Sequence, residues 1–141
     1  MTFIVFSDQH LESKLHNIPE LEQDNRDLFS MVIDKAIENE VDYLISVGDL
    51  FDNNKPSSDT IRFVSEQVRR LRDNNITPLA LAGDHSKPFN GSTWEAVCGF
   101  EPINSAPHFV GVDYSDNPAD VIELINHELN KKEKDTVFCV F

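Results

Sequence analysis

Residues 42–57 read DYLISVGDLFDNNKPS, and this stretch holds the pattern that recurs along the chain. Its first six residues are rich in apolar and β-forming side chains, which predicts a buried strand. Gly48-Asp49 then ends the strand, and a polar loop follows, at whose end Ser57 or Ser58 can cap a helix. The stretch therefore predicts a strand-to-helix junction with an acidic side chain at the carboxyl end of the strand.

The same order of strand, loop and helix recurs on both sides of this stretch. The expected strands are 2–6, 42–47, 77–82, a segment near 108–112, and 136–141. The expected helices are 25–38, 58–74, a short one near 94–98, and one that starts at Asn117-Pro118. The polar residues 7–24 and most of 83–116 are expected to be loops. Alternating strands and helices imply right-handed βαβ units and a largely parallel sheet, which is an α/β fold.

The composition is that of one folded domain. The chain has 141 residues, of which 40% are hydrophobic and 26% are charged, and this excludes a disordered chain. A formal net charge of -13 excludes a basic nucleic-acid binder whose affinity comes from overall charge, although metal ions can neutralise a local acidic site. Cys98 and Cys139 are far apart and in no metal spacing, which argues against a disulfide framework or a cysteine zinc site. The default compartment is then a reducing cytoplasm. No apolar run approaches the ~18 residues of a membrane span, so we expect no membrane partner.

Aspartate and histidine side chains follow three of the predicted strands. The first strand is followed by Asp8 and His10, the second by Asp49, and the third by Asp84 and His85. Because the carboxyl ends of parallel strands meet at one edge of a sheet, we expect these side chains to lie close together. Each pattern alone is common in turns and helix caps, but their shared position favours a site for Mn²⁺, Fe²⁺ or Zn²⁺.

The order Asp-x-His, Gly-Asp-x-x-Asp and Gly-x-His resembles the calcineurin-like metallophosphoesterase superfamily. Within it, residues 48–57 are similar to SbcD-type double-strand-break-repair nucleases, in which Gly-Asp-Leu-Phe is followed by polar residues and Pro-Ser opens a helix. The similarity covers residues 2–90 well and residues 91–135 loosely. It implies an α/β/β/α sandwich and a site with two divalent ions, commonly Mn²⁺. It also implies phosphodiester hydrolysis at DNA ends by an exo- or endonuclease.

Four residues match metal ligands of this superfamily. The resemblance implies that Asp8 and His10 bind the first metal and that Asp49 bridges both. Asp84 stands where the family places an asparagine ligand to the second metal. Since Asp84 adds a negative charge and lacks an amide N–H₂ that could donate to a phosphate, we expect a tighter metal site with weaker phosphate handling.

Three residues are candidates for contact with the substrate. The resemblance implies that His85 contacts the scissile phosphate or, as the catalytic acid, protonates the leaving oxygen. Ser86 stands where the family has an acid that could orient His85. Lys55 and Lys87 flank the site and are candidates for contacts with the phosphate backbone, although a plain surface role fits them equally.

The resemblance also bears on partners and on domain organisation. It implies DNA, an SbcC-type ATPase subunit and a second copy of the chain as partners, in the cytoplasm or the nucleoid. The family's later histidine motifs do not appear in the sequence, and His108 and His127 are poor substitutes for them. We therefore expect residues 1–141 to be the N-terminal part of a metallophosphoesterase domain that is incomplete at the C-terminus.

Two other functions stay open. The same fold could act as a phosphatase or phosphodiesterase on another substrate, against which Leu50-Phe51 and Pro56-Ser57 argue. Alternatively, the chain could be a catalytically degenerate scaffold that binds protein partners. Asp84 and the lack of the later histidines favour a scaffold, whereas the retained aspartate and histidine ligands oppose it.

Overall fold

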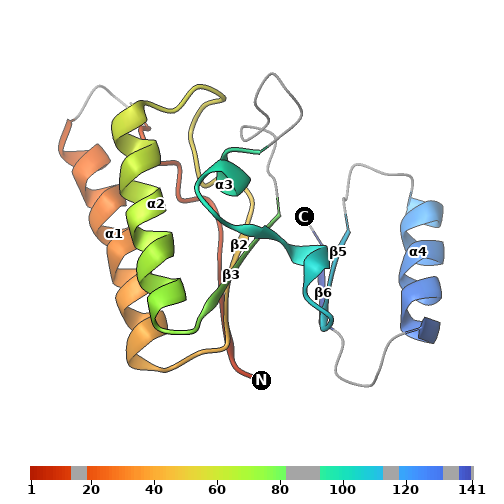
Figure 1. Ribbon diagram of the computed structural model, residues 1–141. Coiled ribbons are helices and arrows are strands. Elements are labelled where there is room, and N and C mark those ends of the chain that lie inside the picture. The colour runs from red at the N-terminus through yellow and green to blue at the C-terminus, as the bar shows by residue number, and fades with distance from the viewer. Residues whose placement is uncertain (14–18, 82–92, 113–117, 132–136, 141) are drawn as a thin grey trace.

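The computed structural model describes residues 1–13, 19–81, 93–112, 118–131 and 137–140 (Figure 1). Its strands are β1 (Phe3–Phe6), β2 (Tyr43–Val47), β3 (Thr77–Leu81), β4 (Glu101–Pro102), β5 (Phe109–Val112) and β6 (Val137–Val140). Its helices are α1 (Pro19–Glu38), α2 (Ser58–Asp73), α3 (Trp94–Val97), the 3₁₀ helix η3 (Ile103–Ser105) and α4 (Pro118–Lys131). Within these ranges, none of the helices has both the length and the apolar character needed to cross a membrane.

The strands form two parallel sheets. The larger has the order β1-β2-β3-β4, and the smaller pairs β5 with β6. Every strand pairing in the described residues is parallel, with Phe3 opposite Tyr43 and Tyr43 opposite Thr77. Parallel neighbours need crossover connections, and α1 and α2 supply them between β1, β2 and β3. The predicted α/β class with a parallel sheet is confirmed.

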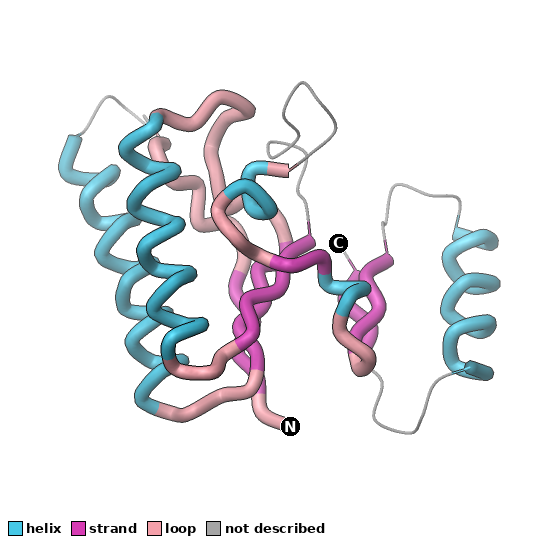
Figure 2. The backbone as a smooth tube through the Cα atoms, viewed as in Figure 1, coloured by secondary structure: helices cyan, strands magenta, loops and turns pink. Residues whose placement is uncertain are grey.

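The elements are arranged in four layers. Figures 1 and 2 show α1 and α2 on one face of the larger sheet, β5 and β6 towards its other face, and α4 beyond them. The helix side of the larger sheet is closed around Phe29, which is fully buried between Phe6 and Phe63. On the other side, the ring of Phe109 packs edge-on against Tyr43, with centroids 5.1 Å apart. This is the helix–sheet–sheet–helix order that the resemblance implied.

The boundaries of most elements lie within two residues of the predicted ones, with one clear exception. Helix α1 begins at Pro19 and not at Asn25, so the prediction of a loop over residues 7–24 is wrong for 19–24. Within residues 19–24, Leu21 is the one large apolar side chain, so no helical period can be recognised there. Proline at the first helical position and the acids Glu20 and Glu22 are the local signals of the start.

Two smaller points are decided by the structure. Ser57, and not Ser58, caps α2, because its hydroxyl oxygen accepts a hydrogen bond from Thr60 N at 3.2 Å. Strand β4 and the 3₁₀ helix η3 were not predicted. Each is only two or three residues long, which is too short to show a period.

Candidate metal centre

The loops that follow β1 and β2 are held side by side by main-chain hydrogen bonds. His10 N donates to Asp49 O at 3.0 Å, and Leu11 N donates to Leu50 O at 2.9 Å. Asp52 N then donates back to Leu11 O at 3.0 Å. The pairing of β1 with β2 thus continues past the ends of both strands. Three apolar side chains of these loops are fully buried: Leu11, Leu50 and Phe51.

The candidate ligands sit on unusual backbone. Asp8, His10 and Asp49 have positive φ angles of 54°, 43° and 47°. A non-glycine residue in this region costs about 1–2 kcal/mol, although Asp, Asn and His tolerate it better than most residues do. Gly48, with a φ of 102°, precedes Asp49 and makes the sharp turn there. Such strain persists only where the surroundings enforce it, and here the hydrogen-bonded loops and their buried anchors do so.

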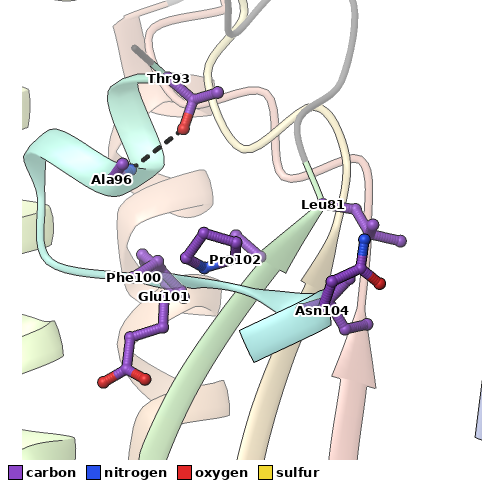
Figure 3. A pocket seen from close by; sticks show the side chains of 9 residues that line it. Leu81, Thr93, Ala96, Phe100, Glu101, Pro102 and Asn104 are labelled. Carbon is purple, nitrogen blue, oxygen red and sulfur yellow. Dashed lines mark hydrogen bonds between the residues drawn. The ribbon is translucent and has the colours of Figure 1, made fainter. Parts of the chain in front are cut away.

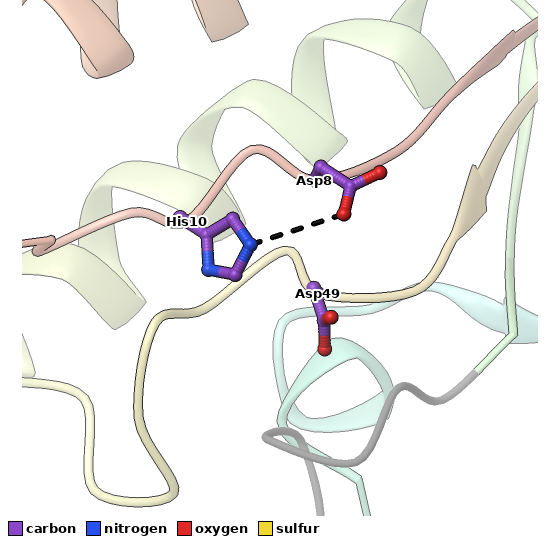
Figure 4. Close-up of side chains that lie close together, drawn as sticks. All are labelled: Asp8, His10 and Asp49. Atoms are coloured by element: carbon purple, nitrogen blue, oxygen red, sulfur yellow. Dashed lines mark ion pairs between the residues drawn. The ribbon is translucent and has the colours of Figure 1, made fainter.

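The strained loops bring three ligand atoms together. One ligand atom from each of Asp8, His10 and Asp49 lies within 4.8 Å of the others. Figure 4 shows how the three side chains lie close together. His10 Nε2 is 3.9 Å from Asp8 Oδ1. The Asp8 side chain is 72% exposed, whereas that of His10 is 35% exposed. We call these three residues the metal trio.

The metal trio fits a divalent cation. Asp49 Oδ1 is buried and has no hydrogen-bond partner within the described residues. A buried acceptor left unsatisfied costs about 1–3 kcal/mol, and more if it is charged, so its occurrence calls for an explanation. A cation at the trio would satisfy it. Two carboxylates and one imidazole are also a donor set that suits first-row divalent metals.

Asp52 is a residue of this site to which the sequence pattern assigned no role. Its Oδ1 lies 3.1 Å from His10 Nδ1, on the side of the ring away from Nε2. The signal that could have found it is its place as the last residue of the Gly-Asp-x-x-Asp motif. The contact itself joins residues 42 apart and follows from the register of the two loops.

Both long helices hold the loop after β1. From α1, Asn25 Nδ2 donates to His10 O at 3.3 Å. At the start of α2, the carboxylate of Glu12 accepts from Ser57 N at 3.0 Å and from the Thr60 hydroxyl at 2.6 Å. Burial opposes ionisation of Glu12, but these hydrogen bonds outweigh it and lower the pKa of the carboxyl. Glu12 is therefore an anion bound at the N-terminus of α2, and its hydrogen bonds link the loop after β1 to this helix.

Of the other predicted site residues, Lys55 alone lies in the described part of the chain, and it is not part of the metal trio. Asp84, His85 and Lys87 lie outside the described residues, so their roles stay predictions. Lys55 lines an open hollow of about 400 Å³ whose other walls are Glu12, Glu22, Asn53 and Ser57. None of these residues belongs to the trio, and the contact of Lys55 with a phosphate backbone also stays a prediction.

A second hollow, of about 200 Å³, lies between the end of β3, α3 and the β4–η3 segment (Figure 3). Its polar groups already serve the fold. The Thr93 hydroxyl caps α3 by accepting from Ala96 N at 3.2 Å, and Asn104 Oδ1 accepts from Gly111 N at 2.8 Å. Glu101 accepts from an arginine of α2. The metal trio is therefore the better candidate for chemistry.

Comparison with known proteins shows the family of the chain. The profile of the family described as calcineurin-like phosphoesterase matches residues 1–140. The chain belongs to the calcineurin-like phosphoesterase family. Calcineurin-like phosphoesterases use divalent metal ions, and the trio is a group of this phosphoesterase that can hold one.

Curated relatives of this phosphoesterase include several archaeal proteins. The chain is 39% identical over 82 residues to the DNA double-strand break repair protein Mre11 of Saccharolobus solfataricus, a match covering 58% of the chain. It is 41% identical over 109 residues, or 77% of the chain, to the protein of that name in Thermoplasma acidophilum. These matches cover 22% and 28% of the relatives, so the chain spans about a quarter of their length.

Proposed function

We propose that the protein acts in metal-dependent hydrolysis of DNA phosphodiester bonds during double-strand-break repair. The metal trio carries the proposal. It combines a strained backbone, three suitable donor atoms and a buried carboxylate oxygen that has no hydrogen-bond partner among the described residues. The chain that holds it also belongs to a phosphoesterase family. The choice of DNA as the substrate is supported by the relatives, which are named as DNA double-strand break repair proteins.

The proposed ligands are divided between two cations, for which we favour Mn²⁺. Asp8 and His10 would hold the first cation, Asp84 would contribute to the second, and Asp49 would serve both. When bound, such ions supply Lewis acidity and counter-charge for a phosphodiester, which is why an acidic protein can take an anionic substrate. Main-chain hydrogen bonds between the two loops hold the backbone at His10 and Asp49, so we expect binding to need little reorganisation of the backbone.

We assign proton transfer and substrate contact to residues near these ligands. An imidazole has an unperturbed pKa of about 6.5, so His85 can give a proton to the leaving oxygen at neutral pH. Lys55 and Lys87 contact the phosphate backbone in this proposal. As partners we propose an SbcC-type ATPase subunit and a second copy of the chain, with a cytoplasmic location next to the chromosome.

Calorimetric titration of the chain with Mn²⁺ tests the metal part of the proposal. We expect micromolar binding that His10→Ala abolishes, because the imidazole is one of only three donors in the trio. His127→Ala is the matched control, since His127 is exposed on α4 and should leave binding unchanged. Equal binding by both variants would contradict a site at the trio.

Cleavage of linear duplex DNA in Mn²⁺ by the full-length protein tests the reaction, and its Asp84→Asn variant tests the ligand set. We expect the Asn variant to keep or raise DNA cleavage, because Asn restores an amide donor and removes a negative charge. Hydrolysis of small phosphodiesters or phosphoproteins without DNA cleavage would favour the alternative substrate class. If both proteins bind no metal and cleave nothing, the scaffold function is favoured instead.

A further inference from the structure

We propose that Asp52 is a positioning residue that selects the tautomer of His10 and aims its Nε2 atom at the metal. This inference rests on the proposed metal centre and adds to it a residue outside the ligand group. The observation behind it is that the two nitrogens of one imidazole ring face two different carboxylates. Asp52 Oδ1 lies 3.1 Å from Nδ1, and Asp8 Oδ1 lies 3.9 Å from Nε2.

The chemistry of the Asp52 contact fixes which nitrogen carries the proton. An ionised carboxylate can only accept hydrogen bonds, so at 3.1 Å the His10 Nδ1 atom must be the donor. A neutral imidazole carries one proton, and Nε2 then keeps its lone pair. Figure 4 shows this nitrogen directed towards Asp8, which is the side on which the metal trio gathers. The lone pair therefore points where a cation would bind.

The backbone keeps Asp52 and His10 in register. His10 N donates to Asp49 O and Asp52 N donates to Leu11 O, so the two loops carry both side chains in a single hydrogen-bonded ladder. The two side chains are also only 35% and 36% exposed. Partial burial matters because a fully exposed pair of this kind would contribute almost nothing to orientation.

Asp52 is better explained as a positioning residue than as a fourth ligand. It is not part of the group whose ligand atoms lie within 4.8 Å of one another. Its Oδ1 faces the ring nitrogen that points away from Asp8. Carboxylates that orient a ligating histidine in this way typically account for about 10- to 100-fold in metal affinity.

The first test reads the tautomer directly in the metal-free protein. In ¹⁵N NMR spectra recorded well above the ordinary imidazole pKa of about 6.5, we expect His10 of the wild type to show a protonated Nδ1 and an unprotonated Nε2. Asp52→Ala should mix the two tautomers. Asp52→Asn should restore the wild-type pattern, because the amide oxygen also accepts from Nδ1–H. Asp24→Ala, at an exposed position of α1, is the matched control.

The second test measures Mn²⁺ affinity of the same proteins by calorimetry. We expect Asp52→Ala to weaken binding about 10- to 100-fold and Asp52→Asn to recover most of the loss. A wild-type ring protonated on Nε2, or an Ala variant with unchanged tautomer and affinity, overturns the proposal. If the Ala variant does not fold, the wild-type and Asn spectra still decide the tautomer.

The two readouts separate this inference from the proposed function. The tautomer is measured without metal or DNA, so it tests the Asp52 contact alone. A wild type that shows the expected tautomer but binds no Mn²⁺ would contradict the proposed metal centre, and with it the purpose that we assign to Asp52. A wild type that binds Mn²⁺ with the opposite tautomer would contradict only the role of Asp52.

Discussion

Replacing Asp49 by asparagine should stabilise the metal-free protein while removing its response to Mn²⁺. The buried Oδ1 of Asp49 has no hydrogen-bond partner in the described structure, and an unsatisfied charged group there costs about 1–3 kcal/mol or more. Asparagine has the same shape without the charge, and it tolerates the positive φ of 47° as well as aspartate does. The asparagine amide still leaves a polar atom at this position, so only the cost of the charge is removed, and we expect the free energy of unfolding without metal to rise by about 1 kcal/mol.

Added Mn²⁺ should reverse the order of stability. A ligand that binds only the folded state at 100 times its Kd raises the free energy of unfolding by about 2.7 kcal/mol. The wild type should show this gain, whereas Asp49→Asn should show little of it, because a carboxylate of the metal trio is lost. The wild type is thus the less stable protein without metal and the more stable one with it.

Urea unfolding in EDTA and in excess Mn²⁺ measures both effects. Asp24→Asn is the matched control, because Asp24 is exposed on α1 and its change should move neither midpoint. The reasoning is refuted if Asp49→Asn is less stable than the wild type in EDTA. It is equally refuted if Mn²⁺ stabilises the variant as much as it stabilises the wild type.

Three further predictions concern the scaffold. A Cβ at Gly111 would lie 2.3 Å from Leu81 Cδ2, so Gly111→Ala should lower the free energy of unfolding by about 1–3 kcal/mol. An unchanged midpoint of thermal unfolding would mean that β5 does not pack on β3. The Arg26 guanidinium holds the pKa of Asp59 below its ordinary value of 3.8, so this pair stabilises the fold above that pH and loses its effect as pH falls. Asp59→Asn should therefore weaken the dependence of the urea midpoint on acid pH, and an identical dependence in the variant would contradict the pairing. Burial raises the pKa of Cys98 to about 11, so peptide mass spectrometry should find this thiol alkylated by iodoacetamide only after unfolding, and rapid labelling of the native protein would disagree.

The structure of residues 42–57 could be predicted from their sequence, because the interactions that determine it are local. An apolar β-forming run, a Gly-Asp turn and a serine that caps a helix each act within a few residues. Residues 43–47 accordingly form a strand, and Ser57 accepts from Thr60 N. The gathering of Asp8, His10 and Asp49 was also predictable, because carboxyl ends of parallel strands share one edge of the sheet.

The misplaced start of α1 shows where local patterns lose their information. Apolar periodicity reports which face of a helix is buried, and residues 19–24 carry too few apolar side chains to report one. Only proline at the first helical position and the acids Glu20 and Glu22 mark the helix there. A polar first turn is therefore easily mistaken for a loop.

The sequence by itself determined the α/β class, the parallel direction of the strands and three side chains of the candidate site, because these follow from local propensity and general rules of chain topology. Only the tertiary structure decided that Asp52 meets His10 and that Glu12 fills the N-terminus of α2. These pairs join residues more than 40 positions apart. Such contacts are set by the register of two loops and by the packing that anchors them, and no local pattern encodes that register.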